Sequence, residues 1–207
     1  RALSGAFALL SGRSLNDLEA LFGDLGGLSV GALHGLQRRR ADGGSITIAP
    51  ERAVERVRGL LNRLAQDLPG LMIEDKGATI ALHYRAHPEL GPAATAAAEA
   101  LITAESASLA LLYGDHVVEI RPRGTDKGTA LAAFMAEAPF RGRRPLMLGD
   151  DHTDEDAFVA ALRLDGAGVV VGPRRPSCAQ YTLPDPTAVR AWIGVLADAF
   201  EPGRFAR

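Results

Sequence analysis

The apolar and polar positions change from one periodicity to another along the chain, and these changes predict its secondary structure. Apolar residues stand in unbroken runs at 146–148 and 167–171, as strands buried on both faces of a parallel sheet require. Similar short runs at 7–10 and 28–33 predict two more strands. Helical patterns separate these runs, so the chain is predicted to fold as an α/β protein with a Rossmann-like parallel sheet.

Helical spacing predicts four helices around this sheet. The first begins at Ser14, whose distance from Asp17 suits a capping box. Others begin near Lys127 and Thr153, and the last runs over about 189–200. Their inner faces are predicted to carry Leu15, Leu18, Leu21, Phe22, Ala130, Leu131, Phe134, Met135, Phe158, Ala161, Leu162, Trp192, Ile193 and Leu196.

The middle of the chain follows a different pattern. A helix opened by Pro50 is predicted to bury Val54, Val57, Leu60, Leu61 and Leu64. Strands at 71–73 and 79–83, an alanine-rich helix over 92–104, and a hairpin of 109–112 with 117–120 should follow. We interpret the three arginines 38–40, which precede Gly43-Gly44, as a solvated turn at a domain boundary. The predicted organisation is a core of residues 1–40 and 121–207 with an inserted α+β cap of residues 41–120.

Composition narrows the classes of function. The chain has 207 residues, 47% of them apolar and 23% charged, and a net charge of −2. This balance predicts neither nucleic-acid nor membrane binding. The single cysteine, Cys178, excludes an internal disulfide and suits a reducing, cytoplasmic compartment. The first residue is Arg1 and a strand-like run follows within a few residues, so we expect the sequence to begin inside a domain. The oligomeric state does not follow from the sequence.

An acidic stretch follows the apolar run at 146–148. Five carboxylates occupy the seven positions from Asp150 to Asp156, and such repulsion favours a bound cation. An alternative is an acidic helix N-terminus capped by Thr153. That alternative accounts for the carboxylates at 154–156 but not for Asp150 and Asp151, which precede the cap at the carboxyl end of a strand. The pattern therefore favours a metal site at these two residues.

Two other strand-to-helix turns carry groups that suit an anion. Ser11, Gly12 and Arg13 combine a hydroxyl, backbone amides and a cation before a helix N-terminus, although an ordinary turn explains them equally well. Lys127 stands at a helix N-terminus, where a cation is unfavourable unless an anion lies nearby; a solvated lysine is the alternative. His34 by itself suits a structural role. In a parallel sheet the three turns meet at one edge, which predicts phosphoryl transfer with Mg²⁺, with the insert as a lid.

These segments resemble the trehalose-phosphatase family of the haloacid dehalogenase superfamily. Residues 149–158 are similar to its fourth motif, 10–14 to its second and 121–128 to its third. The resemblance implies a phosphoryl site at Ser11, Gly12, Arg13 and Lys127, a loop at His34-Gly35 between core and cap, Mg²⁺ on Asp150 with support from Asp151 and Asp154, and sugar hydroxyls held by Glu74, Lys76 and Glu119. It implies hydrolysis of trehalose 6-phosphate to trehalose and phosphate, in trehalose biosynthesis.

The sequence departs from that family at its first motif. A strand followed by Asp-x-Asp-Gly-Thr supplies the nucleophilic aspartate, and here the only Asp-x-Asp lies at 154–156, in a predicted helix. We therefore expect an N-terminal strand to be missing and the 207 residues alone to be inactive. Two alternatives are another sugar-phosphate phosphatase of the superfamily and a non-catalytic relative that binds sugar phosphate, although the intact acidic motif argues against the latter. A dinucleotide-binding module at Gly166-Ala167-Gly168 is weaker, because Pro173 follows.

Overall fold

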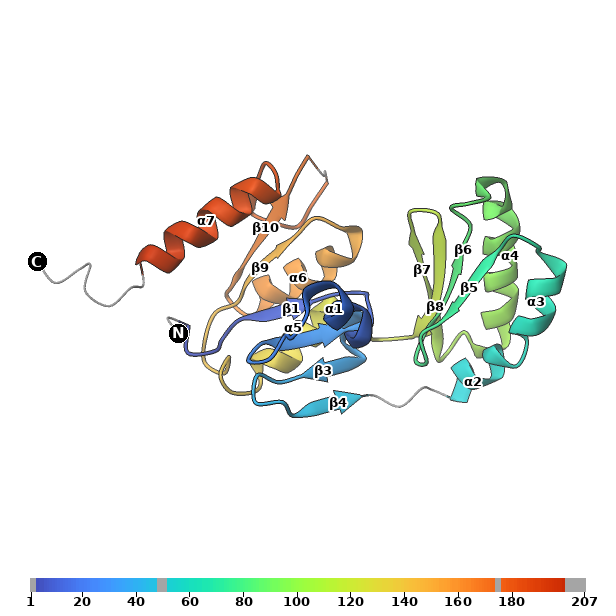
Figure 1. Cartoon of the computed structure of the whole chain (residues 1–207), viewed down its shortest axis with the longest axis horizontal. Helices are drawn as coiled ribbons and strands as arrows, with labels where there is room; N and C mark the ends of the chain where they lie inside the picture. Colours follow the sequence, from blue (N-terminus) through green and yellow to red (C-terminus); the bar gives the residue numbers. More distant parts are fainter. Residues whose placement is uncertain (1–2, 48–51, 174–175, 200–207) are drawn as a thin grey trace, which may run out of the picture. The chain divides into compact units, whose positions relative to one another are not determined.

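The computed structural model describes residues 3–47, 52–173 and 176–199. The chain forms two compact units (Figure 1): the core unit consists of Arg1–Ile46 with Asp126–Arg207, and the inserted unit of Thr47–Thr125. The inserted unit starts and ends a few residues later than the 41–120 of the prediction. At its start the reason is strand β4 (Ser45–Thr47), which extends the sheet of the core unit.

The core unit contains two sheets. One has the order β1-β2-β3-β4, in which β1 (Ala8–Leu10) pairs in parallel with β2 (Ser29–Ala32) and β2 pairs antiparallel with β3 (Gln37–Arg39). The other has the order β11-β10-β9 and is entirely parallel. Its strands are β9 (Leu146–Gly149), β10 (Ala167–Val171) and β11 (Tyr181–Leu183). The parallel strands predicted from the apolar runs are thus confirmed.

Helices follow the strands of the core unit as the periodicity predicts. They are α1 (Leu15–Phe22), α5 (Lys127–Met135), α6 (Glu155–Arg163) and α7 (Pro186–Ala199), with 3-10 turns η1 (Leu33–Gly35) and η4 (His152–Asp154). Ser14 and Asp17 form the predicted capping box, and Asp126 caps α5. Leu18, Leu131, Phe134 and Phe158 are buried as expected.

Some apolar positions on these helices are not in the core. Leu21 and Phe22 of α1 are 59% and 65% exposed, because a helix of two turns presents little more than Leu18 to the sheet. No residue of α7 is buried, and Ile193 is 42% exposed. This helix contacts the edge strand β11, and among the described residues no second layer covers its apolar stripe. The predicted burial is therefore wrong for Ile193 and only partial for Trp192 and Leu196, which are half-buried.

The arginines at 38–40 lie in and next to strand β3 and do not form a solvated turn. Arg38 Nη1 and Arg40 Nε lie 3.1 and 2.7 Å from the two carboxylate oxygens of Glu137, because alternate residues of a strand point to the same side. The hydrogen bond from Arg40, followed by that from Arg38, lowers the pKa of the Glu137 carboxyl. Arg38 also lies over the ring of Phe134, 5.7 Å from its centroid. These contacts fasten β3 to the end of α5.

The inserted unit has one antiparallel sheet of order β5-β6-β8-β7. The predicted strands and the alanine-rich helix are confirmed, but the single helix predicted over 50–64 is divided at Gly59 and Leu60, because glycine favours a break. Pro50 lies outside the described residues. The elements are β5 (Met72–Asp75), β6 (Ile80–His83), β7 (Leu109–Gly114), β8 (Val117–Pro122), α2 (Arg52–Arg58), α3 (Leu61–Asp67), α4 (Gly91–Ile102), η2 (Pro88–Leu90) and η3 (Thr103–Glu105).

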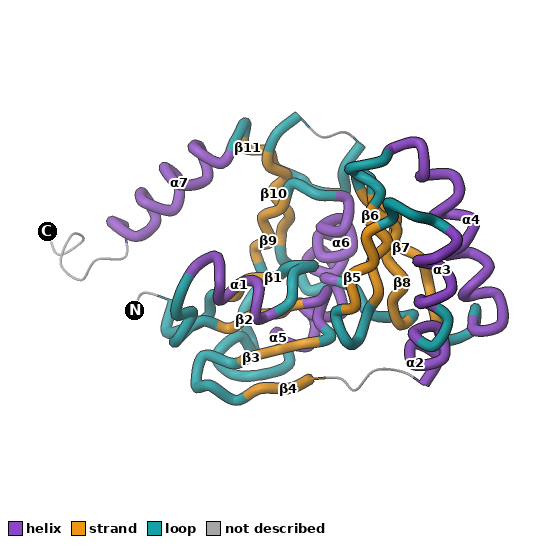
Figure 2. The backbone as a smooth tube through the Cα atoms, turned by 45° about the vertical axis from the view of Figure 1, so that its right-hand side comes forward, coloured by secondary structure: helices purple, strands orange, loops and turns teal. Residues whose placement is uncertain are grey.

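The two faces of this sheet differ in chemistry. Figure 2 shows the helices of the unit gathered on one side of β5–β8. Ile80, Leu82, Val118 and Ile120 point to that side and join one buried apolar cluster with the helices. Side chains alternate along a strand, so the residues between them, including Glu119, belong to the opposite face. No helix within the described ranges is both long and apolar enough to cross a membrane.

Candidate active site

Ser11 occupies the turn between β1 and α1, as predicted. Its backbone N–H donates to the Gly31 carbonyl at 2.8 Å, and its own carbonyl accepts from the His34 N–H at 2.9 Å. The Ser11 Oγ accepts from the Arg13 N–H at 3.1 Å, and an accepting hydroxyl still keeps a hydrogen to donate. The turn is therefore held by β2 and η1 while its hydroxyl remains able to bind an anion.

The predicted junction loop lies directly against this turn. A Cβ built on Gly12 would stand 2.6 Å from His34 Nε2, and one built on Gly35 would stand 2.7 Å from the Ala130 Cβ. His34 is 5% exposed and has a φ of +55°. The loop thus packs between the Ser11-Gly12 turn and helix α5, and the structure brings Gly12, His34 and Gly35 together.

Lys127 and Asp154 form a buried ion pair. Lys127 Nζ lies 2.6 Å from Asp154 Oδ1, and the two residues are 7% and 3% exposed. Asp154 Oδ2 accepts from the N–H groups of Asp150 and Asp151 at 2.9 and 2.8 Å. The Asp154 carboxylate therefore fixes the acidic loop, residues 150–156, and also holds the Lys127 side chain next to this loop. Each charge compensates the other, as buried charges require.

Two glycines make this pairing possible. A Cβ on Gly149 would lie 2.3 Å from Asp154 Cγ, and a Cβ on Gly128 would lie 2.4 Å from the Asp156 carbonyl oxygen. Glycine at these positions lets the acidic loop fold over the end of β9 and lets the N-terminus of α5 approach that of α6. Lys127 reaches Asp154 because of this close approach.

The acidic loop is capped differently from the prediction. Asp151, not Thr153, is the N-cap. Its Oδ1 accepts a hydrogen bond from the His152 N–H, and the Asp154 carboxylate accepts one from the Asp151 N–H. The turn η4 precedes α6 and moves the cap two residues towards β9. A carboxylate is also the stronger partner for the unpaired amides of a helix start.

The acidic loop offers oxygen ligands for a metal ion. Asp150 and Asp151 are exposed at the carboxyl end of β9, and Mg²⁺ commonly binds through one or two carboxylates and several waters. Both oxygens of Asp154 are already engaged by Lys127 and by backbone amides. Across the described ranges, no cluster of three or more His, Cys, Asp or Glu residues suits a metal ion. Asp150 and Asp151 can thus offer two carboxylates to a Mg²⁺ ion whose other ligands are waters, and the predicted metal site stays a prediction.

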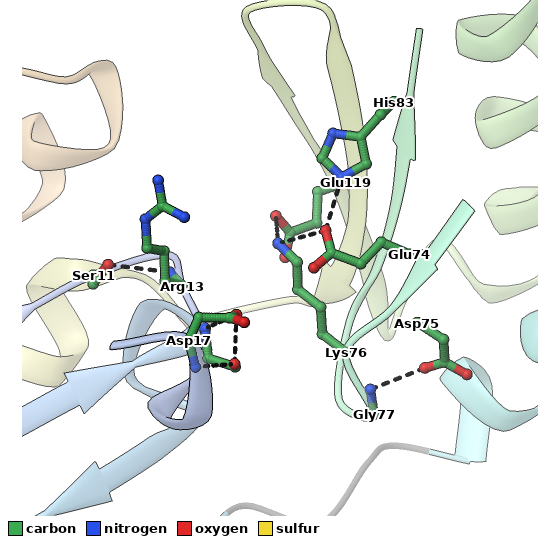
Figure 3. A network of polar contacts seen from close by, with 10 residues as sticks. Ser11, Arg13, Asp17, Glu74, Asp75, Lys76, Gly77, His83 and Glu119 are labelled. Atoms are coloured by element: carbon green, nitrogen blue, oxygen red, sulfur yellow. Dashed lines mark hydrogen bonds and ion pairs between the residues drawn. The ribbon is translucent and has the colours of Figure 1, made fainter. Parts of the chain in front are cut away.

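The inserted unit carries a second group of predicted residues (Figure 3). Lys76 Nζ lies 3.6 Å from Glu119 Oε2 and 3.7 Å from Glu74 Oε2. Glu119 is 6% exposed, whereas the Glu74 side chain is 41% exposed. The sheet therefore brings Glu74, Lys76 and Glu119 to one place, although Glu119 is 45 residues from Glu74 in the sequence.

The structure adds His83 to this group, which the sequence reasoning missed. Its Nε2 lies 2.8 Å from Glu74 Oε2 (Figure 3). His83 pairs with Met72 across the β5–β6 ladder, so it lies diagonally to Glu74 on the same face. The predicted pairing of these two strands could have identified it.

A clamp outside the group holds the loop that carries Lys76. Arg58 Nε and Nη2 lie 2.5 and 3.1 Å from the two oxygens of Asp75, and Asp75 Oδ1 accepts from the Gly77 N–H at 2.9 Å. The hydrogen bond from Arg58 is the main cause that lowers the pKa of Asp75. The clamp fixes the β5–β6 turn and with it the backbone of Lys76.

An open cavity of about 510 Å³ lies elsewhere in the inserted unit. Residues of α4 and of the edge strand β7 line it, together with Arg123. None of the residues predicted for a site is among them.

Known proteins of one family resemble the chain along most of its length. A family model described as trehalose-phosphatase matches residues 2–187. Trehalose-6-phosphate phosphatase of Escherichia coli (strain K12) is 39% identical over 204 residues, which cover 98% of this chain and 76% of that protein. A probable trehalose-phosphate phosphatase of Sinorhizobium fredii (strain NBRC 101917 / NGR234) is 37% identical over 198 residues, covering 95% and 74%.

Solved structures show the same fold. The C-terminal domain of C. albicans trehalose-6-phosphate phosphatase gives a TM-score of 0.75 at 24% identity, covering 95% of this chain and 81% of that chain. A haloacid dehalogenase-like hydrolase from Bacteroides thetaiotaomicron gives a TM-score of 0.71 at 13% identity, covering 94% and 86%. The predicted core of the haloacid dehalogenase type, with its inserted α+β unit, is therefore confirmed as the fold.

Proposed function

Because the chain belongs to the trehalose-phosphatase family, we propose that it serves the hydrolysis of trehalose 6-phosphate to trehalose and inorganic phosphate. The observation that carries the proposal is the linked set of Ser11, His34, Lys127 and the acidic loop. Packing through Gly12, Gly35 and Ala130 connects the first of these groups to the last. A hydroxyl, a lysine and paired carboxylates in one connected set suit a phosphate ester and a divalent cation.

The phosphoryl group is held by Ser11 and Lys127 in this proposal. The Ser11 hydroxyl and the Gly12 amide donate to phosphate oxygens, and the exposed Arg13 adds positive charge. Lys127 has three N–H donors, of which Asp154 takes one, so two can face the phosphate. His34 and Gly35 keep the turn in place beside α5.

Mg²⁺ would be held by Asp150 and Asp151, with Asp154 fixing the loop that carries them. When bound, it would neutralise charge on the phosphate oxygens. In the inserted unit, Glu74, Lys76 and Glu119 would bind sugar hydroxyls and select the sugar. A mixture of carboxylates and an ammonium group suits neutral hydroxyls, which both donate and accept hydrogen bonds. We place the protein in the cytoplasm, as its single cysteine suggests.

The nucleophile is proposed to come from a strand outside these 207 residues. Among the described strands, β1 pairs only with β2, and β9 pairs only with β10. β2 is buried throughout and β10 nearly so, whereas β1 is half-buried and Leu146 of β9 is 47% exposed. Strands at the centre of a doubly wound sheet should be its most buried ones. Here β1 and β9 are less buried than β2 and β10, although β1 and β9 should be the more central strands. Their exposure supports a further parallel strand between β1 and β9.

The chemistry requires an aspartate on that strand. Its carboxylate would attack phosphorus and displace trehalose, whose oxygen takes a proton from the second aspartate of the Asp-x-Asp motif. Water, giving its proton back to that second aspartate, would then hydrolyse the aspartyl phosphate to release phosphate. Ser11 has no basic side chain among its described hydrogen-bond partners, so it does not replace the carboxylate. The 207 residues alone should bind sugar phosphate without hydrolysing it.

A substrate panel tests the proposal. The chain is titrated with trehalose 6-phosphate, glucose 6-phosphate and trehalose, with and without Mg²⁺, and binding is followed by calorimetry. We expect the tightest binding for trehalose 6-phosphate with Mg²⁺, and Glu74→Ala or Glu119→Ala should weaken it while leaving glucose 6-phosphate little changed. Preference for another sugar phosphate would indicate a different phosphatase of the superfamily. Absence of any sugar-phosphate binding would refute the proposal.

A further inference from the structure

Unsatisfied polar atoms gather on one face of the inserted unit. Within the described ranges, four buried side-chain atoms of this unit have no hydrogen-bond partner: Glu119 Oε1, Thr79 Oγ1, and Arg121 Nε and Nη1. Glu119 is 6% exposed and Thr79 is 0% exposed. Buried polar groups are almost always paired, so such a concentration indicates a ligand.

The strand register puts these residues side by side. Ala81 of β6 pairs with Glu74 of β5 on one side and with Glu119 of β8 on the other, so both carboxylates share a face. Arg121 is two residues beyond Glu119 and belongs to the same face. The register continues from the Ile80–Ile120 pair to place Thr79 beside Arg121. Thr79 and Arg121 thus form the row next to that of Glu74 and Glu119, where the fourth unsatisfied atom, Glu119 Oε1, lies.

The mixture of atoms limits the chemistry of the ligand. Glu119 Oε1 can only accept, the arginine atoms can only donate, and the threonine hydroxyl can do both. Two carboxylates, Lys76 and Arg121 also balance in formal charge. An anion would satisfy only the donors and a cation only the acceptor. A neutral compound with neighbouring hydroxyl groups would satisfy all of them at once.

We propose that Thr79 and Arg121 bind sugar hydroxyls, as further contacts beside Glu74, Lys76 and Glu119. This inference rests on the proposed function, since it extends the sugar site of the inserted unit. Arg121 donates from Nε and Nη1, Glu119 Oε1 accepts, and Thr79 joins the two groups through a shared hydroxyl. The site therefore binds the sugar through hydrogen bonds that do not involve its phosphate.

Trehalose binding to the whole chain tests this inference, because it needs no turnover. The titration is followed by NMR for wild type, Thr79→Val, Arg121→Met and Arg121→Lys, with Arg63→Met as the control on the exposed side of α3. One lost hydrogen bond should weaken binding about tenfold for Thr79→Val, and Arg121→Met should weaken it at least as much. Arg121→Lys should retain part of the affinity, and Arg63→Met all of it.

Thermal unfolding separates a binding role from a structural one. Thr79→Val removes an unpaired buried hydroxyl at nearly constant volume, so the melting temperature of the ligand-free protein should rise or stay unchanged. The increase in melting temperature that trehalose produces should shrink. If Thr79 had only a structural role, Thr79→Val would lower the melting temperature of the ligand-free protein and leave the increase produced by trehalose unchanged.

The outcomes keep this inference distinct from the proposed function. Wild-type binding with unchanged affinity in Thr79→Val and Arg121→Lys would overturn the inference and leave the proposed function standing. If wild type binds neither trehalose nor trehalose 6-phosphate, both fail. If Arg121→Met does not fold, Thr79→Val and Arg121→Lys still decide the question.

Discussion

The two units of the chain differ in how their described strands are paired. In the inserted unit, β6 and β8 are each paired on both sides, and one apolar cluster joins the sheet to its helices. In the core unit, seven described strands fall into two sheets, and the buried apolar residues form two separate clusters. Leu10 of β1 nevertheless packs against the cluster that contains Met147 of β9. The described strands of the two sheets are therefore neighbours that are not joined to each other by backbone hydrogen bonds.

This difference follows from the way each kind of sheet is built. An antiparallel sheet pairs strands that are close in the sequence, so a contiguous segment completes it. Parallel strands need crossover connections, and a central strand is usually distant in the chain from some of its neighbours. Removing one central strand from the core unit would therefore divide its sheet and leave the inserted unit intact.

The largest expected effect is the completion of the core sheet. We predict that a synthetic peptide with an apolar strand and the sequence Asp-x-Asp-Gly-Thr, added to the chain with Mg²⁺, raises phosphate release from trehalose 6-phosphate by at least about a thousandfold. The same peptide with its first aspartate changed to asparagine should raise the melting temperature of the core unit without activity. Mg²⁺-dependent phosphate release by the 207 residues alone would contradict this prediction.

Next in size is the loss of the buried pair in the core unit. Asp154→Asn leaves Lys127 as an uncompensated buried charge and should lower the free energy of unfolding by about 3–5 kcal/mol. Replacing both residues by apolar ones, as in Lys127→Met with Asp154→Leu, should recover part of the loss. Hydrogen exchange should show faster opening in α5 and α6 and unchanged protection in β6 and β8. Equal loss of protection in both units would show that they unfold together.

A smaller change tests the inserted unit in the same way. Ile80 is fully buried in its apolar cluster, and Ile80→Val should cost about 1 kcal/mol of unfolding free energy. The effect should appear in the hydrogen exchange of β6 and β8 only. Leu21→Ala, at an exposed position of α1, is the matched control and should change neither unit appreciably.

The smallest effect concerns pH and the Arg58–Asp75 clamp. The pKa of Asp75 is lowered below its ordinary value of 3.8 by Arg58, so the clamp contributes fully above that value and is lost as the pH falls below it. The Asp75 side chain is 38% exposed, which limits the contribution to about 0.5 kcal/mol. Unfolding titrations from pH 6 to pH 3 should show this extra loss for wild type and not for Asp75→Asn. Equal slopes for both proteins would exclude the clamp as the cause.

Much of the fold could be predicted from the sequence because it depends on local patterns. The unbroken apolar run at 167–171 required a buried parallel strand, and the capping box at Ser14 fixed the start of α1. A helix was predicted to begin near Lys127, and the structure agrees. Periodicity does not show, however, which apolar positions are covered by another element. Phe22 and Ile193 were therefore predicted in the core although both are exposed.

The amino-acid sequence by itself determined the types of chemistry in this protein: a hydroxyl turn, a lysine at a helix start and an acidic loop. Only the tertiary structure decided which groups meet. The Lys127–Asp154 pair depends on the approach of two helices at Gly128, and the contact of His83 with Glu74 depends on strand register. Local patterns of the sequence indicate whether a residue is buried or exposed. Which residues distant in the sequence come into contact depends on the packing of helices and strands, and a short segment of sequence does not specify that packing.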